Sequence, residues 1–204
     1  MSAIDPSLIA VYADESCLGN GREGDNPGGA AGLIECMRPV SGELVRRDYW
    51  LSDRATTNNR MALHSVIEAF RILGGKGRRL RVVFTSDSNY IVKGMSEWLP
   101  GWIARGWARK GGPIENLELW KQAAALVRPH EVQWVWVRGH DGHPQNEYAN
   151  DLAVRAAREL SSSGGAVDSG FEQWLAAKTA KGVVRAPTPF PPLGFRAGRP
   201  LPHG

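Results

Sequence analysis

Apolar and polar positions follow two periods along the chain, one typical of strands and one typical of helices. Apolar, β-branched runs predict five buried strands, at 8–14, 30–37, 43–51, 80–84 and 132–137. Apolar residues at helical spacing predict helices at 57–73, 88–95, 114–127 and 146–160. Strands that alternate with helices favour an α/β sheet in which crossover helices connect parallel strands.

The 204 residues suffice for one domain of about 150 residues and an extension. We assign residues 1–160 to the domain. A Ser/Gly run at 161–165 is typical of a linker, and 168–180 could form a short amphipathic helix. Prolines recur from Pro187 onward, so the basic tail of the segment 161–204 is expected to be disordered.

The net charge of +4 is unevenly distributed along the chain. Five basic residues and no acidic residue follow Glu172, which leaves 20 basic and 21 acidic residues in the rest. A nucleic-acid surface on the folded body must therefore come from local clustering of basic residues. The tail could add non-specific affinity for phosphate backbones, or it could simply be solvated.

The same sequence argues against several classes of protein. The longest apolar run falls far short of the roughly 18 residues that a membrane-spanning helix needs. The N-terminus lacks the basic and apolar segments of a signal peptide, and two cysteines do not make a disulfide framework. We expect a cytoplasmic monomer that does not bind membranes.

Two aspartates are candidates for chemistry because each closes a predicted strand. Asp14 follows the first apolar run and Asp87 follows the fourth. The C-terminal ends of neighbouring parallel strands lie about 5 Å apart, so two such carboxylates can share divalent cations. An isolated aspartate at a strand end is more often a turn or a helix cap. The metal-site interpretation therefore depends on the surrounding motifs.

Those motifs resemble ribonuclease HI, which cuts the RNA strand of RNA–DNA hybrids. The resemblance is carried, in this order, by residues 11–20, 56–63, 82–88 and 138–147, and it covers most of residues 8–160. It implies a ribonuclease H-like, mixed five-stranded sheet with flanking helices, in which the first, fourth and fifth strands are parallel. It also implies Mg²⁺ or Mn²⁺ as the cofactor and an RNA–DNA hybrid as the partner and substrate.

The family pattern has four carboxylates, and this chain differs at two of those positions. Ala62 stands where the family has Glu, and Asn150 stands where it has Asp. The resemblance assigns metal binding and catalysis to Asp14 and Asp87, with Asn150 as a weak ligand through its amide oxygen. It also places His140 to transfer a proton near the leaving group, which an imidazole can do at neutral pH. His143 is expected to cap or pack at the start of the last helix.

Two other acidic residues could supply the missing charge, and simple geometry argues against both. Glu15 stands where the family usually has Gly. It follows Asp14 on a strand and should point to the opposite face, unless the strand has already ended. Asp151 is displaced about 100° around the helix from Asn150.

Three interpretations of the altered carboxylates stay open. The chain could be a nuclease with a modified metal site, in which Glu15 or Asp151 supplies the missing charge. It could be a hybrid-binding protein that has lost catalysis. It could also carry deliberate substitutions at Ala62 and Asn150 that trap a complex. A domain that binds other proteins on an old nuclease fold is a further class, and it predicts no preference for hybrids.

The resemblance also implies a set of hybrid-binding residues. Amides at four positions match family contacts in the minor groove: Asn20, Asn58, Asn59 and Asn89. Thr57 and Arg60 match positions near the DNA phosphates. A tryptophan-rich stretch at 97–110 resembles the family's basic protrusion that grips the DNA strand. Most of its rings are expected to be buried, and Trp98 is the one expected to meet the nucleic acid.

Overall fold

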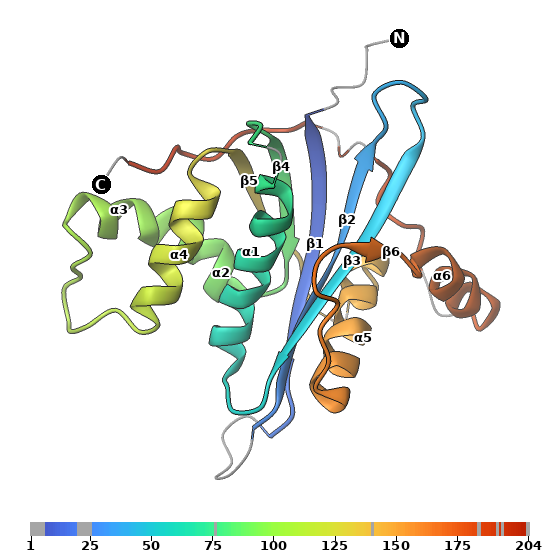
Figure 1. Ribbon diagram of the computed structural model, residues 1–204, viewed down its shortest axis with the longest axis horizontal. Helices are drawn as coiled ribbons and strands as arrows, with labels where there is room; N and C mark the ends of the chain where they lie inside the picture. The colour runs from blue at the N-terminus through green and yellow to red at the C-terminus, as the bar shows by residue number, and fades with distance from the viewer. Residues whose placement is uncertain are drawn as a thin grey trace.

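The protein, described by a computed structural model, is built around one twisted sheet with helices on both faces (Figure 1). The structure describes residues 7–19, 26–75, 77–139, 141–182, 185–190, 192 and 194–202. No helix within these ranges is both long and apolar enough to cross a membrane.

The sheet contains six strands in the order β5-β4-β1-β2-β3-β6. They are β1 (Leu8–Cys17), β2 (Gly28–Met37), β3 (Leu44–Asp53), β4 (Arg81–Ser86), β5 (Glu131–Trp136) and β6 (Val167–Asp168). The first three form an antiparallel meander, and β4 and β5 continue the sheet in parallel with β1. The expected α/β fold is confirmed. The sheet has one strand more than expected, because the two residues of β6 are too few to show a period in the sequence.

The helices divide between the two faces of the sheet. They are α1 (Asn58–Gly74), α2 (Asn89–Lys93), the π-helical turn η1 (Gly94–Trp98), α3 (Leu99–Ala104), α4 (Leu117–Val127), α5 (Pro144–Glu159) and α6 (Phe171–Ala180). Figure 1 shows α1 to α4 on one side of the sheet and α5 with α6 on the other. Each face therefore has its own apolar layer.

Alternation along β1 supplies both layers. Ile9, Val11 and Ala13 belong to the core that contains α1 and α4. Ala10 and Tyr12 belong to the smaller core that contains α5 and α6. Because successive side chains of a strand point to opposite faces, this pattern directs Asp14 towards α5 and Glu15 towards α1.

Helix α5 crosses the sheet at very close range. A Cβ atom added at Gly29 on β2 would lie 2.0 Å from the carbonyl oxygen of Ala153, so only glycine permits this approach. The helix begins with Pro144, and the Nδ1 atom of His143 accepts a hydrogen bond from the backbone N–H of Asn146 at 3.3 Å. The expected capping role of His143 is confirmed, and the first turn of α5 is fixed near the end of β1.

Some element boundaries differ from the sequence prediction in ways that affect the site. β1 continues past Asp14 to Cys17, because Glu15 and Ser16 still pair with β2. The expectation that the first strand ends at Asp14 is therefore wrong.

The predicted helix 88–95 is divided into α2 and η1. A Cβ atom added at Gly94, where the division occurs, would lie 2.1 Å from the Trp120 ring.

The chain after residue 160 packs against the domain where it is described. The Ser163 hydroxyl bonds to the backbone N–H and the carbonyl of Trp50 on β3. Tyr148 donates from its hydroxyl to Asp48 at 2.5 Å, and the backbone N–H of Gly170 donates to the same carboxylate at 3.0 Å. The Pro-rich segment has no helix or strand in its described residues, yet it also makes hydrogen bonds to the domain. Where the domain ends along the chain stays a prediction.

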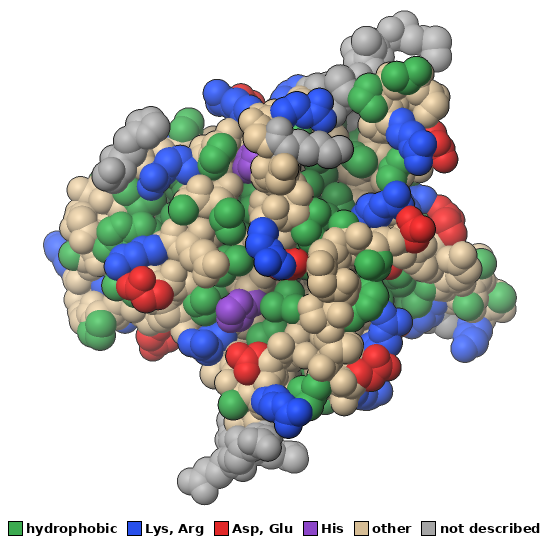
Figure 2. All heavy atoms as spheres, viewed as in Figure 1, with side chains coloured by type: hydrophobic (Ala, Val, Ile, Leu, Met, Phe, Trp, Pro, Cys, Tyr) green, Lys and Arg blue, Asp and Glu red, His purple; other side chains and the backbone are tan. Residues whose placement is uncertain are grey.

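Charged side chains do not form one large basic field on the face drawn in Figure 2. Lysine and arginine side chains are scattered there among acidic ones (Figure 2). This distribution agrees with the near-neutral charge of the chain before its basic tail.

Candidate active site

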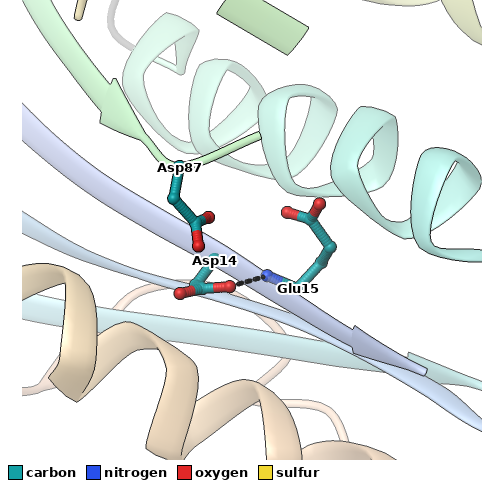
Figure 3. Close-up of side chains that lie close together, drawn as sticks. All are labelled: Asp14, Glu15 and Asp87. Carbon is teal, nitrogen blue, oxygen red and sulfur yellow. Dashed lines mark hydrogen bonds between the residues drawn. The ribbon is translucent and has the colours of Figure 1, made fainter. Parts of the chain in front are cut away.

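Three carboxylates meet where β1 and β4 run side by side. Asp14 and Glu15 lie on β1, and Asp87 follows the last residue of β4. The last parallel pair in this ladder is Ala13 with Ser86, so Asp87 emerges directly beside Asp14. One oxygen atom from each of the three carboxylates lies within 4.8 Å of the others (Figure 3). The expected convergence of Asp14 and Asp87 is present, and Glu15 joins it.

Asp14 and Glu15 reach the same point from opposite faces of the sheet. Figure 3 shows the Asp14 carboxylate on the α5 side and the Glu15 carboxylate on the α1 side, with Asp87 descending from the end of β4. The β1–β4 ladder has ended at Ser86, so no neighbouring strand separates the two faces at this edge. The alternation of side chains therefore does not exclude Glu15 from the cluster, and the geometric objection to Glu15 is wrong.

Asn146 contacts the cluster, although the sequence analysis assigned it no role within the motif 138–147. Its side chain is 2 % exposed, and its Nδ2 atom donates to Asp14 Oδ2 at 3.2 Å and to the carbonyl of Ala13 at 3.3 Å. Both partners are acceptors, which fixes the orientation of the amide. The backbone N–H of Glu15 donates to Asp14 Oδ1 at 2.7 Å. Both oxygens of Asp14 are therefore held in place.

Burial and mutual repulsion make the carboxylates of the cluster hard to ionise. Burial raises the pKa of Asp14 to about 9, and repulsion from Asp87 and Glu15 acts in the same direction against the two hydrogen bonds. Burial and repulsion from Asp87 raise the pKa of Glu15 to about 8, although Ser88 donates a hydrogen bond to it. Crowded carboxylates become easier to ionise when a cation lies between them. A cation bound between these carboxylates would therefore displace protons from them.

Asp151, Asn150 and Ala62 lie outside this cluster of carboxylates. Asp151 on α5 accepts a hydrogen bond from Trp174 Nε1 at 2.8 Å and forms an ion pair with Lys178 at 3.3 Å. It therefore faces α6, and it is absent from the acidic cluster found among the described residues. Asn150 is half-buried one turn after Asn146 on the same helix. Ala62 is buried in the core layer that packs on the Glu15 side of the sheet.

The end of β5 and the loop that follows it both contact Asp87. Trp136 Nε1 donates to the backbone carbonyl of Asp87 at 2.9 Å. A Cβ atom added at Gly139 would lie 2.3 Å from Asp87 Oδ2, so this loop contacts the carboxylate through bare backbone. Two predicted site residues, His140 and Asn20, lie outside the described residues.

The remaining predicted binding residues lie at the start of α1 and in the α2–η1 segment. Helix α1 begins at the end of the sheet where β1 ends (Figure 1). Thr57 caps this helix by accepting from the backbone N–H of Arg60 at 3.3 Å. Asn59 and Asn89 are exposed, whereas Asn58 and Arg60 are half-buried.

The tryptophan-rich stretch forms a pocket beside these residues. Within this stretch Trp102 is buried at 8 % exposure, Trp107 is half-buried and Trp98 is 36 % exposed, so fewer of its rings are buried than expected, while Trp120 on α4 is fully buried. The pocket has a volume of about 470 Å³ and is lined by Tyr90, Trp98, Trp102, Arg105, Arg109, Lys110 and Glu115. Aromatic rings beside cationic groups suit a nucleic-acid strand.

Comparison with known proteins gives a consistent result. The RNase H family model matches residues 6–158. Ribonuclease H of Cupriavidus pinatubonensis (strain JMP 134 / LMG 1197) is 42% identical over 156 residues, which is 76% of this chain and 98% of that protein. Among solved structures, LC9-RNase H1 is 60% identical with a TM-score of 0.87, covering 98% of this chain and 96% of its own. It is described as a type 1 RNase H with the type 2 active-site motif. The PFV RNase H domain shares the fold at 17% identity, with a TM-score of 0.61 over 75% of this chain and 96% of its own.

Proposed function

Because the chain belongs to the ribonuclease H family, we propose that Asp14, Glu15 and Asp87 hold the divalent cations with which it hydrolyses the RNA strand of RNA–DNA hybrids. One observation carries this proposal. Three carboxylates from neighbouring parallel strands bring their oxygens within 4.8 Å of one another. An arrangement that costs this much repulsion is expected only where a cation relieves it.

The donor set fits Mg²⁺ or Mn²⁺. Both are hard cations that take oxygen ligands, and the cluster offers carboxylate oxygens only. Divalent cations bound there would activate water and stabilise the charge of the leaving oxygen. Asn150 is proposed as a neutral ligand on α5. Asn146 would orient Asp14 through its bond to Oδ2.

Glu15 supports a working nuclease over an inactive hybrid-binding protein. The family carboxylate missing at Ala62 would come from α1, and Glu15 points to that same side of the sheet (Figure 3). We propose that Glu15 replaces it. The similar LC9-RNase H1 is a type 1 RNase H with the type 2 active-site motif, which supports a rearranged set of ligands in this chain. A protein that only binds hybrids would have no need for a third crowded carboxylate.

The other proposed roles follow the family resemblance. His140 would transfer a proton at the leaving group. The hybrid would be bound by Asn20, Thr57, Asn58, Asn59, Arg60, Asn89 and Trp98. Support for this surface comes from the exposure of Thr57, Asn59, Asn89 and Trp98. A cytoplasmic location and a monomeric state complete the proposal, and the presence of Cys17 and Cys36 as thiols is in keeping with a reducing compartment.

Cleavage of an end-labelled RNA–DNA hybrid tests the proposal directly. The wild type is assayed with Mg²⁺ and separately with Mn²⁺, beside Glu15→Gln, Asp87→Asn and Asp151→Asn. We expect cleavage by the wild type and by Asp151→Asn, and its loss in the other two variants. Hybrid binding is measured in parallel by gel mobility shift. A wild type that binds the hybrid and cleaves in neither metal would establish the non-enzymatic alternative. Retained cleavage in Glu15→Gln would remove Glu15 from the site.

A further inference from the structure

The C-terminal segment 185–190 lies against the start of α5, on the helix that carries Asn146. This segment is outside residues 6–158, which the family model matches. The similar structure of LC9-RNase H1 covers 98% of this chain, so the extension is not peculiar to this sequence. Phe190 packs against the apolar cluster formed by β1, β2, α5 and α6. The segment is thus attached to the domain beside the site.

Thr188 makes a two-point backbone contact with Gln145. The backbone N–H of Thr188 donates to Gln145 Oε1 at 3.1 Å, and Gln145 Nε2 donates to the Thr188 carbonyl at 2.7 Å. Gln145 is 0 % exposed and is the second residue of α5. A fully buried amide with both polar atoms satisfied by one backbone residue is held in a single orientation.

A second contact runs from Thr188 through His143. His143 Nδ1 accepts from the backbone N–H of Asn146, so the ring proton lies on Nε2. Nε2 therefore donates to the Thr188 hydroxyl, 3.1 Å away. Arg185 also lies 3.8 Å from Asp141, but both side chains are largely exposed and this ion pair adds little.

These contacts end at a metal-binding carboxylate. His143 and Gln145 directly precede Asn146 in the first turn of α5, and Asn146 donates to Asp14 at 3.2 Å. We propose that Thr188 is a positioning residue of the nuclease site, which acts through His143 and Gln145 to fix the amide of Asn146 on Asp14. The inference rests on the proposed function, since the orientation of Asp14 matters to activity only if Asp14 is a ligand.

The test uses the full-length chain with three substitutions at one position. Thr188→Val removes the hydroxyl and keeps the shape, Thr188→Pro also removes the N–H donor within an already Pro-rich segment, and Thr188→Ser restores the hydroxyl. Thr179→Val on the exposed face of α6 is the matched control. We expect kcat to fall about threefold in Thr188→Val and about tenfold or more in Thr188→Pro, as for other outer-shell partners of metal ligands. KM and the activity of Thr188→Ser and Thr179→Val should be nearly unchanged.

Two further measurements separate positioning from simple support of the fold. In the metal-free protein, amide hydrogen exchange in the first turn of α5 should accelerate in Thr188→Pro and not in Thr179→Val. In an Asn146→Ala background, Thr188→Val should have little additional effect on kcat, because the two changes break the same path. Additive effects on kcat, or wild-type kcat in Thr188→Pro, would overturn the inference while leaving the nuclease assignment intact. A wild type that fails to cleave hybrid would instead overturn the proposed function on which the inference rests.

Discussion

Replacing Glu15 by Gln should abolish cleavage of the hybrid in the presence of metal and should also make the metal-free protein more stable. Burial and repulsion from Asp87 raise the pKa of Glu15 from 4.5 to about 8. Between these two values the folded protein binds more protons than the unfolded chain, so stability falls as pH rises through this window. Glutamine has nearly the same shape and no charge, and it removes this loss. A carboxylate at this position therefore lowers the stability of the metal-free protein at neutral pH.

The size of the effect follows from the pKa interval. Each pH unit between the unfolded pKa and the working pH corresponds to about 1.4 kcal/mol. From 4.5 to pH 7 this gives an upper limit of about 3 kcal/mol. The Glu15 side chain keeps some contact with solvent, which reduces the effect. We expect Glu15→Gln to raise the free energy of unfolding by about 1–2 kcal/mol at pH 7, and by much less at pH 5.

Urea unfolding in the presence of EDTA, at pH 5 and at pH 8, measures this difference. Glu159→Gln is the matched control, because Glu159 is exposed at the end of α5. The control should unfold at the wild-type urea concentration at both pH values. The reasoning is refuted if Glu15→Gln is less stable than the wild type at pH 8, or if its gain is the same at pH 5 and pH 8. Adding Mg²⁺ should stabilise the wild type and have little effect on Glu15→Gln.

Four other changes have outcomes set by the structure. In Gly29→Ala the new Cβ would lie 2.0 Å from the Ala153 carbonyl. This variant should force α5 outward and lower the free energy of unfolding by about 2 kcal/mol or more. In the control Gly74→Ala the new Cβ meets no atom within 4 Å, so the thermal midpoint should be unchanged or slightly raised. Asn150→Asp should reduce the Mg²⁺ concentration needed for half-maximal cleavage, since divalent affinity rises with ligand charge; an unchanged Mg²⁺ titration would show that this side chain does not face the cations. Mg²⁺ binding at pH 7 should release protons, because the β1 carboxylates have pKa values of about 9 and about 8; calorimetry in buffers of different ionisation enthalpy would detect this, and a buffer-independent heat would contradict it. Trp98→Ala should weaken hybrid binding about tenfold without changing the metal requirement, as measured by fluorescence anisotropy.

The fold was accessible from the sequence because its signals are local. The runs that become β1, β4 and β5 are rich in apolar residues, and parallel strands bring the residues at their ends together. The meeting of Asp14 with Asp87 follows from that rule once the family resemblance makes the first and fourth strands parallel neighbours. By contrast, β6 pairs through only two residues, and nothing in so short a segment distinguishes it from a loop.

The complete set of site residues was not accessible, for reasons of tertiary geometry. The alternation rule placed Glu15 on the face opposite Asp14, and the structure agrees with that placement. The rule could not reveal that the β1–β4 ladder stops at Ser86, so that one carboxylate at the edge meets side chains from both faces. Asn146 was missed because its partner Asp14 is 132 residues away in the chain. The contact of Glu15 with the cluster and the contact of Asn146 with Asp14 both depend on tertiary structure, and no fixed spacing in the sequence predicts them.

Because Glu15 lies on β1, its separation from Asp14 does not depend on how α1 packs against the sheet. When one ligand comes from a strand and the next from a helix, their separation is set by the packing between the two elements and varies with it. Asp14 and Glu15 are joined by a single peptide bond, whose planar geometry limits how far they can separate. A shift of α1 against the sheet would therefore leave this pair intact. Substitutions on the core-facing side of α1 should consequently change thermal stability. They should leave the spacing of the proposed ligands Asp14 and Glu15 largely unchanged.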